Sequence, residues 1–109
     1  MSLNLRVNYD DKEERIDVNI GGELDIYTSD EFKEAVMKEF NKNREDIVIN
    51  AKELKFVDST GLGVLISILK ESQENDKKIY IDNAKANIRK IFDITDLDKL
   101  FVFRGEQDE

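Results

Sequence analysis

Apolar and polar residues alternate along two short stretches near the start of the chain. Residues 3–9 read Leu-Asn-Leu-Arg-Val-Asn-Tyr, and after a charged stretch residues 16–20 alternate again as Ile-Asp-Val-Asn-Ile. A period of two residues is typical of strands with one face buried and the other in water. Only a short charged segment separates the two stretches, so together they predict an antiparallel hairpin.

The next segments alternate between helical and strand patterns. Thr28 and Glu31 have the spacing of a capping box, and apolar residues then recur at helical intervals, which predicts a helix from about residue 29 to 41. The short run 47–49 is β-branched and lacks polar alternation, which predicts a strand covered on both faces. The run 79–81 predicts the next buried strand.

Two more helices and a last strand are predicted in the second half of the chain. After residues 58–60, apolar residues recur at i, i+3, i+4 and i+7, and the polar segment 70–75 ends this helix. The apolar positions are Leu62, Leu65, Ile66 and Leu69 in the second helix and Ile88, Ile91 and Phe92 in a short third helix. Residues 100–103 predict a final strand.

The predicted elements follow one another in the order β-β-α-β-α-β-α-β. Each helical crossover returns the next strand parallel to the one before, normally with a right-handed connection, whereas the initial hairpin is antiparallel. This order predicts an α/β fold with a mixed β-sheet and covering helices. A chain of 109 residues can bury one core but not two, so residues 1–109 are expected to form a single domain.

The composition narrows the chemistry available to the chain. Without Cys or His, it lacks disulfides, zinc–thiolate sites, thiol nucleophiles and the commonest general base. Its net charge of −8 disfavours nucleic acids and anionic membranes as partners. No apolar run approaches a membrane span, and the first residues lack a signal-peptide pattern. This composition excludes much enzyme chemistry, and the cytoplasm is the default location.

The most informative segment joins a predicted strand to a predicted helix, and it reads Asp58-Ser59-Thr60-Gly61-Leu62-Gly63. The glycines leave the backbone beside Ser59 approachable. They do not form a dinucleotide fingerprint, because Ile66 stands where its third glycine would be, and the Gly-Lys-Ser/Thr of a phosphate loop is also missing. The residues alone leave two roles open, a helix N-cap at Asp58, Ser59 or Thr60 and an accessible phosphoryl acceptor at Ser59.

A receiver domain is an alternative that the acidic residues suggest. Asp58 would be its phosphoaccepting aspartate, and Asp10 with Asp11 would be its acidic pair. A receiver, however, needs a helix between its first two parallel strands, and only residues 10–15 are available here. The acidic segment 10–14 is most simply a solvated turn, and its spacing matches no calcium loop.

Three blocks resemble the anti-sigma factor antagonists, the single-domain members of the sulfate transporter and anti-sigma factor antagonist (STAS) superfamily. In chain order they are Gly22-Glu23-Leu24-Asp25, the segment 58–63, and Ile91-Phe92-Asp93-Ile94-Thr95 followed by Leu97. The likeness spans nearly the whole chain, and the middle block is its most specific part. The Ser-Thr pair and the last block are closer to the general-stress branch than to the sporulation branch.

The resemblance implies a STAS-type mixed sheet and a role in partner switching. It implies a regulatory binding protein that is not an enzyme and needs neither cofactor nor metal. Ser59 is then the residue phosphorylated by an anti-sigma factor that is also a serine kinase. The unmodified monomer would bind that anti-sigma factor and release a sigma factor, phosphorylation would block binding, and a metal-dependent serine phosphatase would restore it. The alternative is a STAS scaffold or subunit in a stress-sensing or membrane-transport complex. Family members commonly end in another helix, whereas residues 104–109 are polar, so that helix is expected to be shortened or absent.

The expected partner surface surrounds Ser59. From the middle block it includes Asp58, Thr60, Gly61, Leu62 and Gly63. Glu23 and Asp25 lie just past a strand end, where they either meet cationic groups of the partner or form an ordinary polar turn. Val64 and Ile68 project away from the core stripe of their helix. Either the third helix covers these two residues or they contact the partner.

Overall fold

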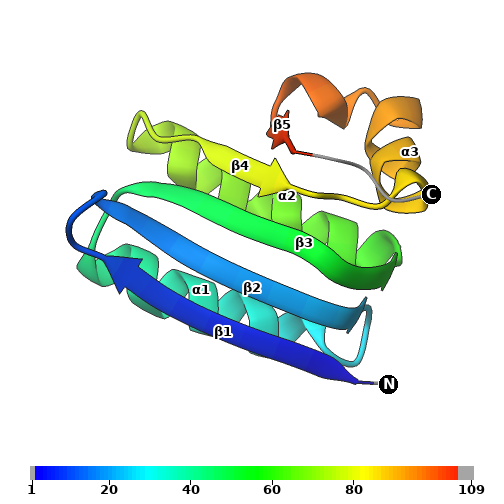
Figure 1. The fold of residues 1–109 in the computed structure, drawn as a ribbon, viewed down its shortest axis with the longest axis horizontal. Coiled ribbons are helices and arrows are strands. Elements are labelled where there is room, and N and C mark those ends of the chain that lie inside the picture. Colours follow the sequence, from blue (N-terminus) through cyan, green and yellow to red (C-terminus); the bar gives the residue numbers. More distant parts are fainter. Residues whose placement is uncertain (1, 106–109) are drawn as a thin grey trace.

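A computed structural model describes residues 2–105 of the chain (Figure 1). Its elements are β1 (Leu3–Asp10), β2 (Arg15–Leu24), α1 (Ser29–Lys42), β3 (Asp46–Val57), α2 (Ser59–Glu74), β4 (Ile79–Asp82), α3 (Ala86–Ile94), the 3-10 turn η1 (Leu97–Lys99) and β5 (Val102–Arg104). The predicted order of strands and helices is confirmed. Most of the polar tail predicted at 104–109 lies outside the described residues.

The strands form one five-stranded sheet in the order β1-β2-β3-β4-β5. β1 pairs with β2 in antiparallel register, and the other neighbouring pairs are parallel. The predicted mixed sheet with an initial hairpin is therefore confirmed. Because β2 and β3 are parallel neighbours, their carboxyl ends lie side by side, and the loops that follow them meet.

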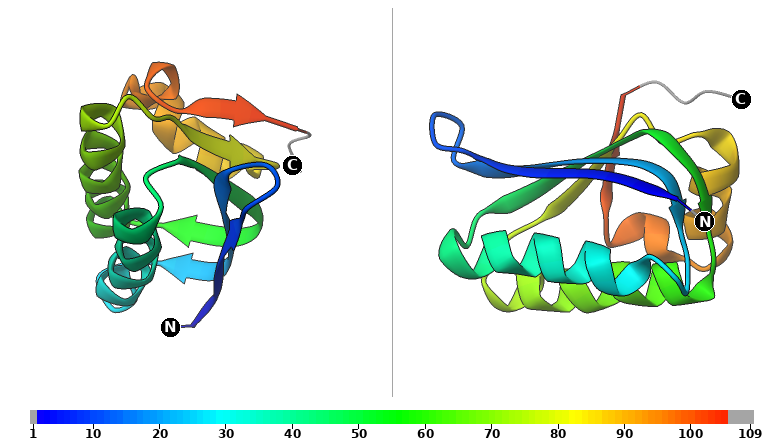
Figure 2. Two further views of the ribbon diagram at one scale, coloured as in Figure 1. Left: turned by 90° about the vertical axis from the view of Figure 1, so that its left-hand side faces the viewer. Right: turned by 90° about the horizontal axis from the view of Figure 1, so that it is seen from below.

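Figure 2 shows α1 and α2 side by side against one face of the sheet, and within residues 2–105 no helix covers the opposite face. Right-handed crossovers between strands laid down in one direction place successive helices on the same face. The prediction that strand 47–49 is covered on both faces is therefore wrong. Ile47 and Ile49 are buried beneath the helices, whereas Val48 is only half-buried.

Buried apolar side chains form a core between the sheet and the helices. They include Ile16, Val18, Ile20 and Leu24 from β2, Phe32, Val36 and Phe40 from α1, Ile47 and Ile49 from β3, Leu65, Ile68 and Leu69 from α2, Ile79 and Ile81 from β4, and Ile88 and Phe92 from α3. Most of these positions carry the periodic patterns seen in the sequence. None of the helices within residues 2–105 is long and apolar enough to cross a membrane.

Strand limits depart from the sequence prediction in three places. β2 continues through Gly22, and β3 extends beyond 47–49 in both directions, because backbone pairing continues after the side-chain pattern has broken. Register shifts between β2 and β3 accompany this extension. The last strand begins at Val102 instead of Leu100, because η1 precedes it and the Leu100 N–H donates to the Leu97 carbonyl at 3.0 Å.

Helix α1 begins at Ser29, but the predicted capping box is absent. The Thr28 hydroxyl donates to the Glu23 carbonyl at 2.8 Å and accepts the Asp25 N–H at 2.9 Å. It makes no capping bond to the helix, and Glu31 is exposed. The spacing was therefore misleading, because a hydroxyl that could cap a helix also bonds readily to nearby loop backbone.

Candidate functional site

Asp58 is the N-cap of α2. Its Oδ1 accepts the Gly61 N–H at 2.8 Å, and its backbone is extended, with φ −97° and ψ −176°. This bond satisfies one of the N–H groups that have no partner in the first turn of a helix. Of the three residues that the sequence left open for the cap, Asp58 fills the role.

Ser59 is the first residue of α2 and is exposed. Within residues 2–105 its hydroxyl makes no hydrogen bond, so it is not needed to hold the helix start. Thr60, the next residue, is exposed as well. An exposed hydroxyl at a helix N-terminus lies where the macrodipole favours added negative charge. The geometry is compatible with a phosphoryl acceptor.

The second carboxylate oxygen of Asp58 joins this site to the loop after β2. Oδ2 accepts the Ile26 N–H at 3.1 Å, and the Asp58 N–H donates to the Leu24 carbonyl at 3.2 Å. The Gly-Glu-Leu-Asp block and the Ser59 loop, more than 30 residues apart in sequence, are therefore neighbours.

Asp25 does not present its carboxylate to a partner, contrary to one of the two predicted roles. Its side chain is only 2% exposed. Oδ1 accepts the N–H groups of Tyr27 at 2.9 Å and Thr28 at 3.2 Å, and Oδ2 is buried without a partner in the described chain. Asp25 therefore organises the loop from inside, which is the polar-turn alternative. Glu23 is half-buried and accepts the Ser2 N–H at 3.3 Å.

The two glycines of the middle block differ in role. Gly61 is buried, and a Cβ there would lie 2.3 Å from the Leu24 carbonyl oxygen, so α2 approaches β2 closely at this point. Gly61 is therefore a packing residue, and its predicted place on the partner surface is wrong. Gly63 is exposed with nothing within 4 Å of an added Cβ. Leu62 is half-buried against the core.

Ile68 belongs to the core, with 1% exposure, so of the two alternatives that the sequence left open for this residue, contact with a partner is wrong. The physical reason is that the buried face of α2 is rotated from the predicted apolar stripe, so that Leu62 and Ile66 are only half-buried. The buried residues of this helix are Gly61, Leu65, Ile68, Leu69 and Ser72. Val64 is half-buried and also packs on the core. Of Val64 and Ile68, only Val64 retains accessible surface.

Large apolar side chains that the sequence analysis missed are exposed beside this site. Ile26 is 65% exposed and Tyr27 is 74% exposed, both in the loop that Asp58 contacts. Phe56, near the end of β3, is also exposed. The available signal was a pair of large apolar residues directly after the Gly-Glu-Leu-Asp block, outside any periodic element.

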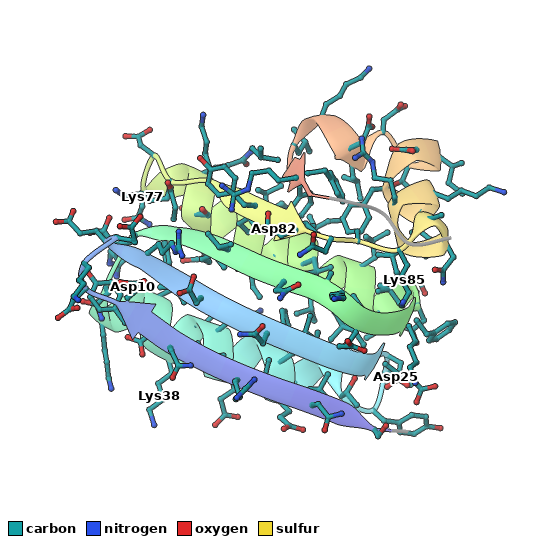
Figure 3. All side chains as sticks on the ribbon, in the orientation of Figure 1. Asp10, Asp25, Lys38, Lys77, Asp82 and Lys85 are labelled. Atoms are coloured by element: carbon teal, nitrogen blue, oxygen red, sulfur yellow. The ribbon has the colours of Figure 1, made fainter. Side chains whose placement is uncertain are left out.

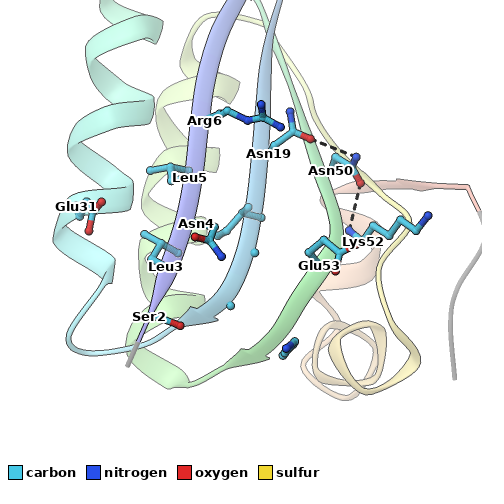
Figure 4. Close-up of a pocket in the computed structure, with 14 residues that line it drawn as sticks. Ser2, Leu3, Asn4, Leu5, Arg6, Asn19, Glu31, Asn50, Lys52 and Glu53 are labelled. Atoms are coloured by element: carbon cyan, nitrogen blue, oxygen red, sulfur yellow. Dashed lines mark hydrogen bonds between the residues drawn. The ribbon is translucent and has the colours of Figure 1, made fainter.

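A shallow pocket of about 770 Å³ is lined by residues of β1, β2 and β3 together with Glu31 of α1 (Figure 4). Its lining includes Gly21 of β2 and mixes polar residues such as Arg6 and Lys52 with apolar ones such as Leu5. Asn50, which also lines it, donates to Asn19 at 3.3 Å. The pocket does not include Ser59 or Asp58, so it is separate from the candidate site.

The acidic turn that suggested a receiver lies at the other end of the sheet. Figure 3 places Asp10 and Asp25 at opposite ends of the molecule. Asp10 Oδ1 accepts the N–H groups of Lys12 and Glu13, each at 3.1 Å, which is the geometry of a side-chain-stabilised turn. Across the described part of the chain, no three acidic side chains gather in a way that could hold a metal ion.

Comparison with known proteins agrees with this architecture. A model of the STAS domain family matches residues 6–109. The anti-sigma-B factor antagonist of Staphylococcus aureus is 36% identical over 110 residues, covering all of both chains.

Two solved structures share the fold. An anti-sigma factor antagonist from Mycobacterium paratuberculosis has a TM-score of 0.80 at 21% identity, covering 94% of this chain and 85% of that one. The Bacillus cell fate determinant SpoIIAA in its phosphorylated form has a TM-score of 0.70 at 21% identity, covering 96% and 93%. Because the family model spans nearly the whole sequence and a relative matches it from end to end, this chain belongs to the STAS domain family.

Proposed function

We propose that this protein is a cytoplasmic anti-sigma factor antagonist that works by partner switching. The unphosphorylated monomer binds an anti-sigma factor with serine kinase activity and thereby releases a sigma factor. Phosphorylation of Ser59 blocks this binding, and a metal-dependent serine phosphatase reverses it. The full-length relative named anti-sigma-B factor antagonist supports the proposal, as does the solved phosphorylated form of a protein with the same fold.

The observation that carries the proposal is the division of roles between two adjacent residues. Asp58 caps α2, so the neighbouring Ser59 hydroxyl is exposed and has no structural bond to break within residues 2–105. In the proposed reaction, the Ser59 oxygen bonds to the γ-phosphorus of ATP held by the kinase. The bond between that phosphorus and ADP breaks, and the hydroxyl proton passes to a base on the kinase.

A phosphoryl group at this position changes the surface more than it changes the fold. It adds roughly −1.5 to −2 charge, and the helix dipole stabilises it by up to ~1 kcal/mol while the adjacent Asp58 repels it. These opposing contributions are small beside a typical domain stability of ~5–15 kcal/mol. Desolvating the same phosphate in an interface can cost several kcal/mol of affinity, so the phosphate acts on binding.

The test is phosphorylation by the cognate anti-sigma kinase with ATP, followed by peptide mass spectrometry. We expect one phosphoryl group at Ser59, no incorporation in Ser59→Ala, and full incorporation in the matched variant Thr60→Ala. Modification chiefly at Thr60, or undiminished incorporation in Ser59→Ala, would reject Ser59 as the acceptor.

A further inference from the structure

The loop between β2 and α1 exposes two large apolar side chains beside the phosphoryl-acceptor site. Ile26 and Tyr27 are 65% and 74% exposed. Single exposed apolar residues are common on protein surfaces, but adjacent ones next to a functional site more often mark a contact. The periodic elements on either side do not require apolar residues here.

This loop is held in place by hydrogen bonds on both sides. The Ile26 N–H donates to Asp58 at 3.1 Å, and the Tyr27 N–H donates to Asp25 at 2.9 Å. The Ser29 N–H donates to the Asp25 carbonyl at 2.9 Å, which joins the loop to the start of α1. Two apolar side chains on such a fixed backbone lose little conformational freedom when a partner binds, which favours affinity.

The charges around the loop define the chemistry of its partner. Glu23 and Asp58 lie beside it, and Asp30 and Glu31 follow in the first turn of α1, within a chain of net charge −8. A surface with an apolar centre and an acidic rim fits an apolar pocket edged by Lys or Arg.

From these contacts we infer that Ile26 and Tyr27 are the apolar anchor by which this protein binds its anti-sigma factor. The inference rests on the proposed function and names the residues that carry the affinity for the anti-sigma factor. The anchor enters an apolar pocket with a basic rim on the anti-sigma factor. Asp58 is a positioning residue, because one carboxylate caps the helix that bears Ser59 and holds the anchor loop.

The experiment is calorimetric titration of the unphosphorylated protein with its anti-sigma factor. We expect Ile26→Ser and Tyr27→Ser each to weaken binding by about tenfold or more, in the range of interface hot spots. Ile94→Ser is the matched control, because Ile94 is 73% exposed but lies on α3. It is expected to leave the affinity within about twofold of the unaltered protein. Melting curves check that each variant is folded.

Each outcome bears on a different statement. If the unaltered protein fails to bind any anti-sigma factor, the proposed function is wrong. If it binds and both anchor variants bind equally well, the anchor is wrong while the proposed function stands. Should Tyr27→Ser prove unstable, Tyr27→Gln repeats the test with a longer side chain. A concentration-dependent dimer that Tyr27→Ser abolishes, without a change in anti-sigma affinity, would assign the loop to a second copy of this chain and reject the inference.

Discussion

The carboxylate of Asp58 accepts the Ile26 N–H at 3.1 Å, across 32 positions of the sequence. With its other oxygen the same side chain accepts the Gly61 N–H at 2.8 Å. One residue therefore fixes both the helix that presents Ser59 and the loop that presents Ile26 and Tyr27. The Ser59 hydroxyl and the apolar loop are therefore held beside each other, and a charge added at Ser59 would enter the same surface.

Removal of the Asp58 cap is expected to lower stability, whereas removal of the Ser59 hydroxyl is not. Asp58→Ala removes the helix cap and the bond to the Ile26 N–H, which we expect to cost about 1–2 kcal/mol. Ser59→Ala removes an exposed group and is expected to change stability by less than about 0.5 kcal/mol. Urea unfolding of both variants measures the difference. Equal losses would mean that Ser59 shares the structural role.

The two glycines of α2 are expected to respond to alanine in opposite directions. Gly61→Ala forces a Cβ against the Leu24 carbonyl, 2.3 Å away, and overpacking of this kind costs about 1–3 kcal/mol. Gly63→Ala meets nothing within 4 Å and gains up to ~1 kcal/mol of helix propensity. Unfolding midpoints that shift in the same direction would contradict this assignment.

Truncation of Ile68 is expected to act on the core and not on the partner surface. Ile68 is 1% exposed, and Ile68→Ala should cost about 2–5 kcal/mol of stability by leaving a cavity. Denaturant unfolding checks the loss, and titration at a temperature where the variant remains folded checks that its affinity for the anti-sigma factor is kept. A stable variant with reduced affinity would restore Ile68 to the interface.

Phosphorylation is expected to change affinity far more than stability. Circular dichroism melting of the phosphorylated and unmodified protein should give similar transitions, because the helix dipole and Asp58 act on the phosphate in opposite directions. Calorimetric titration with the anti-sigma factor should show loss of binding. Collapse of the melting transition, or unchanged affinity in a folded phosphoprotein, would overturn the switch mechanism.

Stability is expected to fall at alkaline pH because of groups at the end of the sheet opposite Ser59. The Lys77 ammonium donates to Glu45 at 2.9 Å, and this bond, followed by the charge of Glu45, raises the Lys77 pKa above its ordinary 10.5. Burial, followed by the negative charge of Glu45, raises the pKa of Tyr9 above 10.0. The folded state therefore holds these protons more tightly than the unfolded state.

The sign of the effect follows from this tighter binding. The stabilisation that comes from the raised pKa values of Lys77 and Tyr9 is present below their ordinary pKa values. It is lost as the pH rises through the folded-state values. Glu45→Gln should therefore lower stability most below about pH 10 and progressively less above it. Glu34→Gln, at an exposed position on α1, serves as the control. A stability difference that is constant from neutral to alkaline pH would contradict the linkage.

The order of the elements could be predicted from the sequence because each one buries a regular face. The alternation at 16–20 and the helical spacing after residue 60 report which side chains meet the core, and the structure buries most of them. The covering of only one face by helices was missed. It follows from the order of the strands in the sheet, and the periodicity of a single strand such as 47–49 gives no information about that order.

The site was only partly predictable for a related reason. The position of Ser59 at a helix start was apparent, and so was a cap in its vicinity. What could not be predicted was which neighbours share hydrogen bonds across the sequence. Asp25 and Asp58 are chemically alike, yet one is buried within a loop and the other joins two loops. The burial of Ile68 could not be predicted because Gly61 and Ser72, which share its buried face, give no apolar signal in the sequence.

The bare face of the sheet carries its own protection against self-association. Across its middle lie Asn19, Asn50 and Asn83, whose side-chain amides are joined by hydrogen bonds of 3.3 Å. Arg104 donates two hydrogen bonds to Asp82, of 2.8 and 3.0 Å. A flat apolar face there would invite another sheet to stack on it, whereas amides and ion pairs keep it wetted. Specific recognition of a partner can then depend on the few apolar groups near Ser59, because no large apolar sheet face competes with them for non-specific contacts.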